Sequence, residues 1–286
     1  MKWDRHCTTW PLSETSRFVR CRPHHWHIQE QGTGPGLLLL HGAGGSTHSF
    51  RALIPRLSEH FHVSAFDLPG QGFTRLGTKQ RSSLATMAED IAALCAQENW
   101  MPEAIIGHSA GAALALQLCR ILPKPPERIV GINPALANYG GATNQIFSGL
   151  AKVLAANPLT AGLFSLTGSS RKAVTRMISG TGSQLDDAGL EYYQRLVSDR
   201  RHVDGTLAMM AHWNLNELRQ ALPEVKAHTL FITAAGDKAV PPKTAQDAAA
   251  MMPNAHVSEI KEYGHLVHEE APGLVSEQIL DFLRSS

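Results

Sequence analysis

The serine best placed to act as a nucleophile lies in the segment Gly107-His108-Ser109-Ala110-Gly111. This segment matches the pattern G-x-S-x-G, with an apolar strand expected before it and a helix after it. A nucleophile on such a sharp turn takes a strained backbone conformation, so its neighbours must be small. The start of the helix brings backbone N–H groups and a positive dipole end, both of which stabilise a developing oxyanion. We therefore predict that Ser109 is a catalytic nucleophile.

A second glycine-rich segment has the position of an oxyanion loop. The run HGAGGS occupies residues 41–46, directly after a strongly apolar strand. A loop at this place supplies one backbone N–H to the oxyanion, and the residue after the nucleophile supplies another. We expect these donors to be the N–H groups of Ala43 and Ala110, with Gly44 as the alternative to Ala43. A plain glycine-rich turn is the other interpretation of this segment.

An acid and a base follow later in the chain. Asp237 comes after an expected strand at 229–233, where a carboxylate can orient a histidine, fix its tautomer and stabilise its protonated form. His265 follows Gly264 in a loop just before the last expected helix, and we predict that it is the general base. His268 is its rival, but we expect His268 to lie in or near that helix.

Short apolar runs alternate with amphipathic segments through most of the chain. This alternation predicts an α/β fold with a mostly parallel central sheet and helices on both faces. Residues 1–15 are polar and irregular, and we expect them to form a loosely held arm. The expected strands are 37–40, 61–66, 104–106, 129–132, 229–233 and 256–260, and the expected helices are 47–59, 83–97, 109–122, 243–252 and 271–284.

The alternation stops in the middle of the chain, where only helices are expected, near 145–156, 171–179, 187–199 and 203–213. We therefore divide the chain into a first core part (1–136), a helical lid (137–220) and a second core part (221–286). A lid of this kind covers a site at the carboxyl edge of the sheet. Helices that merely enlarge the core are the alternative. Met209 and Met210 either line a flat, apolar pocket or pack in that core.

Composition excludes several classes of function. The formal net charge of +1 gives no case for binding nucleic acid or an anionic membrane. The longest aliphatic run, 37–40, is far too short for a transmembrane segment, and the N-terminal residues do not resemble a signal peptide. The four cysteines form no C-x-x-C pair, which favours a reduced, cytoplasmic protein.

Metal and cofactor motifs are missing from the sequence. His24, His25 and His27 lie close together, as do His60 and His62, but no cysteine or carboxylate stands at ligand spacing. We expect these histidines to be solvated or hydrogen-bonded. The sequence contains neither the phosphate-binding pattern G-x-x-x-x-G-K-[ST] nor the dinucleotide pattern G-x-G-x-x-G. We therefore expect no metal and no cofactor.

Taken together, the motifs and their order Ser, Asp, His resemble the α/β-hydrolase superfamily over nearly the whole chain. Further segments resemble the family of magnesium-chelatase accessory proteins of bacteriochlorophyll biosynthesis. This resemblance implies an α/β-hydrolase fold with a helical lid and a role near the insertion of magnesium into protoporphyrin IX, but it implies no particular reaction. The segments that carry it are 1–4, 10–11, 16–19, 41–42, 46–50, 67–74, 107–112, 209–211 and 264–270.

Three hypotheses about function follow. The first is a serine hydrolase acting on an ester, thioester or similar bond of a hydrophobic small molecule. The second is a non-catalytic accessory protein that binds a porphyrin or contacts magnesium-chelatase subunits, because a fold does not fix a function. The third is a cofactor-free relative, such as a haloperoxidase-like enzyme or a C–C-bond hydrolase, which the three catalytic residue types do not exclude.

Overall fold

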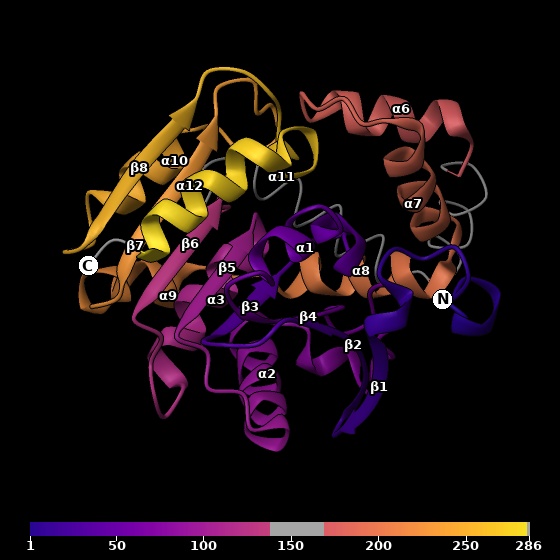
Figure 1. Ribbon diagram of the computed structural model, residues 1–286, viewed down its shortest axis with the longest axis horizontal. Coiled ribbons are helices and arrows are strands. Elements are labelled where there is room, and N and C mark those ends of the chain that lie inside the picture. Colours follow the sequence, from indigo (N-terminus) through magenta and orange to yellow (C-terminus); the bar gives the residue numbers. More distant parts are fainter. Residues whose placement is uncertain (138–168, 285–286) are drawn as a thin grey trace.

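The computed structural model describes residues 1–137 and 169–284, and in these ranges eight strands form one sheet (Figure 1). The strand order is β1-β2-β4-β3-β5-β6-β7-β8. The pairs β1–β2 and β2–β4 are antiparallel, and all other neighbours are parallel. The strands are β1 Ser16–Cys21, β2 His24–Gln31, β3 Gly36–Leu40, β4 His62–Phe66, β5 Ala104–His108, β6 Arg128–Ile132, β7 His228–Ala234 and β8 Ala255–Ile260.

Strand β3 shows why the centre of the sheet has a helix layer on each face. Leu38 and Leu40 belong to one apolar core, whereas Leu37 and Leu39 belong to the other, because successive side chains of a strand point to opposite faces. All four are at most 1% exposed. A strand covered on both faces must be apolar along its whole length, which accounts for the run of four leucines.

Helices α2, α3, α9 and α10 cover one face of the sheet, and α1 and α12 cover the other (Figure 1). Their bounds are α1 Leu53–Leu57, α2 Leu84–Glu98, α3 Ala110–Ile121, α9 Asn216–Ala221, α10 Lys243–Ala249 and α12 Pro272–Arg284. The expected helical segment over 47–59 consists of two short pieces in the structure. A 3₁₀ turn at Thr47–Phe50 comes first, and α1 begins only two residues before Pro55, since proline tolerates only the first turn of a helix.

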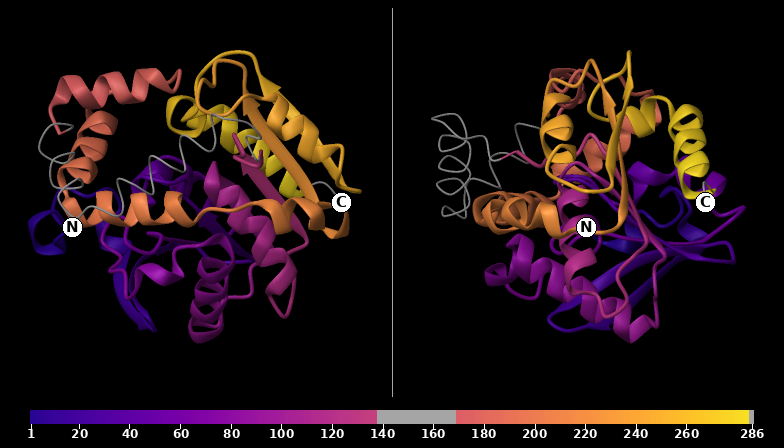
Figure 2. Two further views of the ribbon diagram at one scale, coloured as in Figure 1. Left: turned by 180° about the vertical axis from the view of Figure 1, so that it is seen from behind. Right: turned by 90° about the vertical axis from the view of Figure 1, so that its left-hand side faces the viewer.

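Between β6 and β7 the chain forms the helical insertion that the sequence predicted. Its described helices before α9 are α6 Arg171–Gly180, α7 Asp187–Ser198 and α8 Arg200–His212. Seen from behind, α8 runs along the molecule beneath α6 and α7 (Figure 2). The expected helix near 145–156 lies outside the described residues.

The prediction of a loosely held N-terminal arm was wrong. Trp10 is only 3% exposed, and its ring lies 4.8 Å from that of Phe73. Both belong to an apolar cluster with residues of α6 and α7 such as Val174 and Leu196. The arm lacks a regular hydrophobic period because it contains isolated 3₁₀ turns, yet its aromatic side chains anchor it against the insertion.

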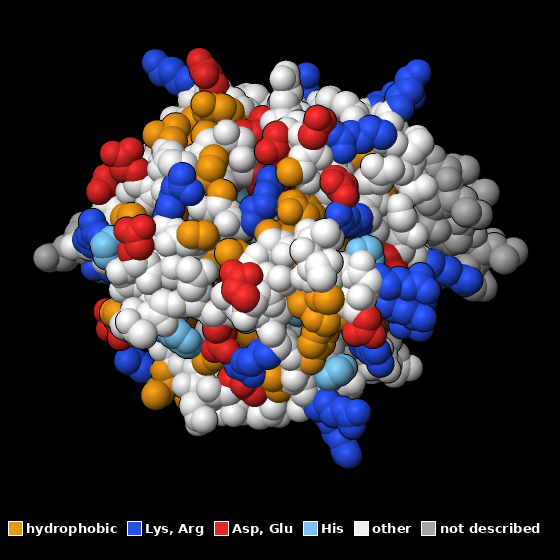
Figure 3. Space-filling model, turned by 45° about the vertical axis from the view of Figure 1, so that its right-hand side comes forward, with side chains coloured by type: hydrophobic (Ala, Val, Ile, Leu, Met, Phe, Trp, Pro, Cys, Tyr) orange, Lys and Arg blue, Asp and Glu red, His pale blue; other side chains and the backbone are white. Residues whose placement is uncertain are grey.

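The surface carries acidic and basic side chains interspersed with small hydrophobic patches on the face in Figure 3. This mixture agrees with the formal net charge of +1. Among the described helices, none is both long and apolar enough to cross a membrane.

Candidate active site

Ser109 occupies the turn between β5 and α3 with φ 53° and ψ −116°. A positive φ is uncommon for a residue other than glycine. The flanking glycines are required by backbone crowding. A Cβ on Gly107 would lie 2.3 Å from the carbonyl oxygen of Gly111, and a Cβ on Gly111 would lie 2.1 Å from that of Leu40. The strand and helix therefore meet at a turn that only this glycine-flanked serine pattern allows.

His265 and Asp237 are brought together from the loops after β8 and β7. The Nδ1–H of His265 donates to Asp237 Oδ2 at 2.7 Å. The other oxygen of the carboxylate, Oδ1, accepts from the N–H groups of Ala239 and Val240, at 2.8 Å each. With its hydrogen on Nδ1, the neutral imidazole keeps a lone pair on Nε2.

Ser109 and His265 line the same cavity, but no hydrogen bond joins Ser109 Oγ to His265 Nε2 in the structure. Such catalytic hydrogen bonds are often long in a free enzyme and shorten when a substrate binds.

His268, the alternative base, is poorly suited to that task. It lies in α11 (Val267–Glu270), is fully buried, and neither of its ring nitrogens has a hydrogen-bond partner among the described residues. Burial, with a smaller effect of His265, lowers the pKa of His268 to about 3. In the described parts of the chain, no carboxylate bonds to His268 to fix its tautomer, whereas Asp237 does so for His265.

Two residues that the sequence did not single out hold the main chain of His265. Asn133 Nδ2 donates to the carbonyl oxygens of His265 (2.9 Å) and Gly264 (3.1 Å), and Asn133 Oδ1 accepts from Ala234 N–H at 2.9 Å. His108 Nε2 also donates to the His265 carbonyl oxygen at 2.9 Å. Burial, together with its histidine neighbours, holds the pKa of His108 well below its usual range, so its ring is neutral.

Asn133 did leave a signal in the sequence. It follows directly after the apolar run of β6, and its φ is 42°, a conformation in which asparagine is several-fold enriched. An asparagine at the carboxyl end of a central strand is therefore a sequence signal for a residue that contacts the loops at the neighbouring strand ends.

The loop after β3 packs directly on the serine. A Cβ on Gly42 would lie 2.9 Å from Ser109 Cβ. The N–H of Gly44 donates to Gln71 Oε1 at 2.7 Å, so the alternative oxyanion donor is already occupied. The N–H groups of Ala43 and Ala110 donate to no described residue. Gln71, which is fully buried, was not identified from the sequence.

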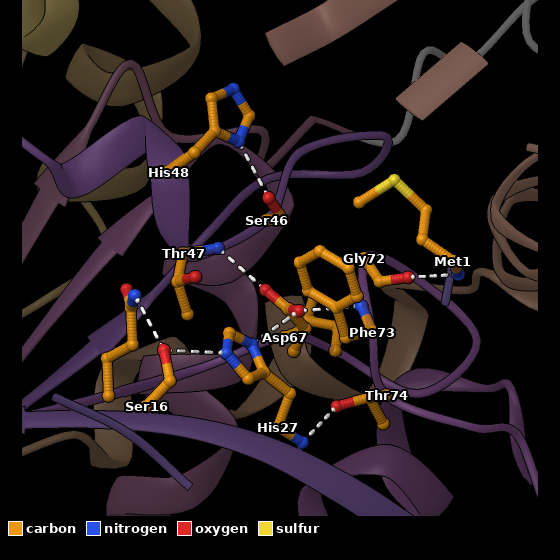
Figure 4. A network of polar contacts seen from close by, with 12 residues as sticks. Met1, Ser16, His27, Ser46, Thr47, His48, Asp67, Gly72, Phe73 and Thr74 are labelled. Carbon is orange, nitrogen blue, oxygen red and sulfur yellow. Dashed lines mark hydrogen bonds and ion pairs between the residues drawn. The ribbon is translucent and has the colours of Figure 1, made fainter. Parts of the chain in front are cut away.

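Asp67, at the end of β4, anchors the far side of this loop (Figure 4). Its carboxylate accepts from Thr47 N–H at 2.7 Å and from Phe73 N–H and His27 Nδ1 at 2.8 Å each. Burial alone would raise the pKa of Asp67, but His27 and the backbone donors outweigh it and hold that pKa well below its usual range.

His27 also contacts Ser16 Oγ at 3.1 Å, so Ser16, His27 and Asp67 resemble a second serine relay (Figure 4). The rings of Trp3 and Phe73 pack on His27 at 5.1 Å each, and His27 and Asp67 are fully buried. We therefore assign this network to holding the loops in place. It agrees with the expectation that the clustered histidines are hydrogen-bonded.

A cavity of about 430 Å³ opens above Ser109, between the oxyanion loop and helices α6, α7 and α8. Of the two methionines considered from the sequence, Met210 lines it, whereas Met209 is 1% exposed and belongs to the core. No lysine, arginine, aspartate or glutamate is among its described lining residues. The apolar lining residues are Met177, Ile178, Val197, Val203, Leu207, Met210 and Leu266.

Comparison with known proteins supports this architecture. Residues 35–272 match the family model of the α/β hydrolase fold. An epoxide hydrolase, CorEH, superposes with a TM-score of 0.80 at 20% identity, covering 94% of this chain and 98% of that one. These findings confirm the predicted fold class.

Two curated relatives are informative. The magnesium-chelatase 30 kDa subunit of Rhodobacter capsulatus is 44% identical over 276 residues, which cover 96% of both chains. The pimeloyl-[acyl-carrier protein] methyl ester esterase of Xanthomonas oryzae pv. oryzae is 26% identical over 276 residues, or 91% of this chain and 99% of the relative. The resemblance predicted from the sequence motifs is therefore confirmed.

Proposed function

Because this chain belongs to the α/β-hydrolase fold family, we propose that it is a serine hydrolase with Ser109 as nucleophile, His265 as base and Asp237 as acid. One observation carries the proposal. Ser109, on its strained turn, faces the same apolar cavity as a histidine whose ring is held by a buried carboxylate.

In the proposed reaction, His265 Nε2 takes the proton of Ser109 Oγ while that oxygen attacks the substrate carbonyl carbon. The N–H groups of Ala43 and Ala110 hold the resulting oxyanion. The protonated His265 then gives its proton to the leaving group, and a water molecule repeats both steps to release the acyl group. Asp237 accepts the Nδ1–H of His265 and stabilises the imidazolium.

The cavity supports a hydrophobic small molecule as the substrate. Aliphatic and methionine side chains form much of its walls, and its described lining contains no lysine, arginine, aspartate or glutamate to bind an ionic group. An ester, thioester or similar bond at Ser109 would place an apolar acyl or alcohol group against these walls. The 26% identity with a methyl ester esterase is consistent with such a bond.

Covalent labelling tests the proposal directly. We expect a fluorophosphonate to label the wild-type protein and the Ser198→Ala control, in which an exposed serine is lost. The Ser109→Ala variant should keep its fold and take up no label, and its ester turnover should fall by roughly 10⁴–10⁶. Full labelling of Ser109→Ala would rule out Ser109 as the nucleophile.

The 44% identity with a magnesium-chelatase subunit favours a second function, that of an accessory protein in magnesium chelation. The protein would then bind a porphyrin or contact chelatase subunits, and catalysis at Ser109 would be dispensable. Complementation separates the two functions. If Ser109→Ala restores pigment formation in a strain lacking this protein, the essential role is not hydrolysis. An unchanged porphyrin absorbance spectrum at saturating protein would count against porphyrin binding.

A further inference from the structure

The cavity above Ser109 contains four side-chain hydroxyls besides that of Ser109, and each donates its hydrogen back to the protein. Their oxygens remain available as acceptors, but none has a hydrogen left for a ligand. The donations are Ser49 to Ser46 O (3.0 Å), Thr181 to Ile178 O (2.7 Å), Tyr193 to Glu269 Oε1 (2.7 Å) and Thr206 to His202 O (2.9 Å).

His202, on α8, differs from these hydroxyls. The N–H of Gly72 donates to His202 Nδ1 at 3.0 Å, so Nδ1 must carry a lone pair. The hydrogen of the neutral ring is therefore on Nε2. The side chain lines the cavity, is 2% exposed, and makes no hydrogen bond from Nε2 to a described residue.

The ring is neutral under ordinary conditions. Burial, with a smaller effect of the N-terminal amino group, lowers the pKa of His202 to about 4. Protonation would also place a hydrogen on Nδ1, directly against the N–H of Gly72. His202 therefore presents a hydrogen-bond donor without a positive charge.

The position of this donor is fixed by backbone contact. A Cβ on Gly205, one turn further along α8, would lie 2.2 Å from the carbonyl oxygen of Gly70. Met209 Sδ lies 3.2 Å from the amide nitrogen of Gln71, whose oxygen holds the oxyanion loop at Gly44. Helix α8 therefore packs directly on the segment that holds the oxyanion loop.

We propose that His202 determines substrate specificity by donating its Nε2–H to an uncharged oxygen acceptor on the molecule bound at Ser109. The substrate is then an apolar ester-like compound with a second oxygen, as a ketone, ether or ester, away from the bond that is cleaved. A purely aliphatic chain would leave the buried donor without a partner, which is unfavourable. This inference rests on the proposed hydrolase function.

A matched series of p-nitrophenyl esters tests the proposal. In each pair, a straight acyl chain is compared with the same chain in which one methylene is replaced by a keto group, at successive positions. We expect one position at which the wild-type kcat/KM for the keto ester exceeds that for the plain ester by about tenfold.

Two variants isolate the donor. In His202→Asn, the side-chain oxygen can still accept from Gly72 N–H, but the donor at Nε2 is lost, so the keto preference should disappear. Thr206→Val removes a hydroxyl whose hydrogen already bonds to the protein, so the preference should persist. For each variant, the measured quantity is the kcat/KM for the keto ester divided by that for the plain ester. A general loss of stability lowers both values and leaves their ratio unchanged.

A binding measurement separates this inference from the proposed hydrolysis. Amides of the same acyl chains are titrated calorimetrically into the Ser109→Ala variant, with and without His202→Asn. The proposal requires tighter binding of one keto amide, by about tenfold, only when His202 is present. Equal affinities at every position, or a preference that survives His202→Asn, would overturn it. Absence of esterase activity in the wild type would instead refute only the hydrolase function.

Discussion

His265 is held by its backbone as firmly as by its ring. Asp237 fixes the imidazole through Nδ1, and Asn133 and His108 both donate to the carbonyl oxygen of the same residue. Catalysis by a general base depends on placing Nε2 within hydrogen-bonding reach of the serine, and a displacement of about 1 Å can cost about a hundredfold in rate. Asn133 is therefore a positioning residue for the proposed base.

The variant Asn133→Gly tests this role. Glycine tolerates the φ of 42° but removes all three amide hydrogen bonds, so we expect kcat/KM for a simple ester to fall by about 10–100-fold. The pH profile should also change, because the position of His265 relative to Asp237 changes. Asn99→Gly, at an exposed asparagine with φ 57°, is the matched control and should leave both unchanged. Equal activity of the two variants would remove Asn133 from the site.

Some residues of the site were predicted from the sequence and others were not. The two groups differ in how far apart in the sequence their contacts lie. Ser109, Asp237 and His265 were predicted because each follows an expected strand within one or two residues of a glycine, which is a local signal. Asn133 and His202 act through bonds to residues 132 and 130 positions away, respectively. Gln71 bonds to Gly44 across 27 positions. Asn133 stands at a strand end, but no local pattern marks His202 or Gln71, and the bonding partners of all three appear only in the folded chain.

At the scale of elements, α8 packs closely on the core. Gly205 and Gly70 meet backbone to backbone. His202 accepts a hydrogen bond from the N–H of Gly72, and Met209 Sδ accepts one from Gln71 Nε2. Because α8 also carries the cavity residues Val203, Thr206, Leu207 and Met210, its position sets one wall of the cavity.

Adding one methyl group to α8 should therefore change the cavity. Alanine favours a helix over glycine by about 1 kcal/mol, yet in Gly205→Ala the new Cβ would meet the Gly70 carbonyl oxygen. We expect a lower melting temperature and a higher KM for esters. Gly180→Ala, at a helical glycine with nothing within 4 Å of the added Cβ, is the control and should be neutral or stabilising. Thermal melting and ester kinetics measure both, and similar results for the two variants would disprove the close contact.

Elements were predictable where one signal dominated. The leucines of β3 mark a buried strand, and the glycine-flanked serine marks the start of α3. Failures arose where two signals conflicted. Pro55 lies in the first turn of α1, so the expected helical segment over 47–59 is divided before it, and Trp10 anchors an arm whose polar composition suggested a loose segment. In both cases a single residue had more influence on the structure than the average composition of the segment around it.

At the scale of the whole molecule, many imidazoles of the described residues are buried. His41, His48, His108, His202 and His268 are each at most 4% exposed. For every one of them, burial is the largest cause that lowers the pKa. An unfolded chain would protonate these rings near the ordinary value of 6.5, so it binds more protons than the folded chain at mildly acidic pH.

The stability that the neutral buried rings contribute should therefore be fully present above pH 6.5. It should decline as the pH falls toward the pKa values of the folded protein, which are about 4 for His202 and about 3 for His268. Each proton taken up only on unfolding lowers the free energy of unfolding by about 1.4 kcal/mol per pH unit. Asp67 cannot account for a decline in this window, because its carboxylate protonates below its ordinary value of 3.8.

Urea unfolding of the wild type and of His268→Leu between pH 7 and 4.5 separates this cause from others. Leucine has a similar volume and cannot be protonated, so the variant should lose less stability on acidification, by up to about 1.4 kcal/mol per pH unit. Phe50→Leu changes a ring 5.5 Å from that of His268 and should lower stability equally at both ends of the range. If stability declined as steeply in His268→Leu as in the wild type, His268 would not be the source of the acid sensitivity. The same comparison with His202→Asn would then test whether His202 is the source.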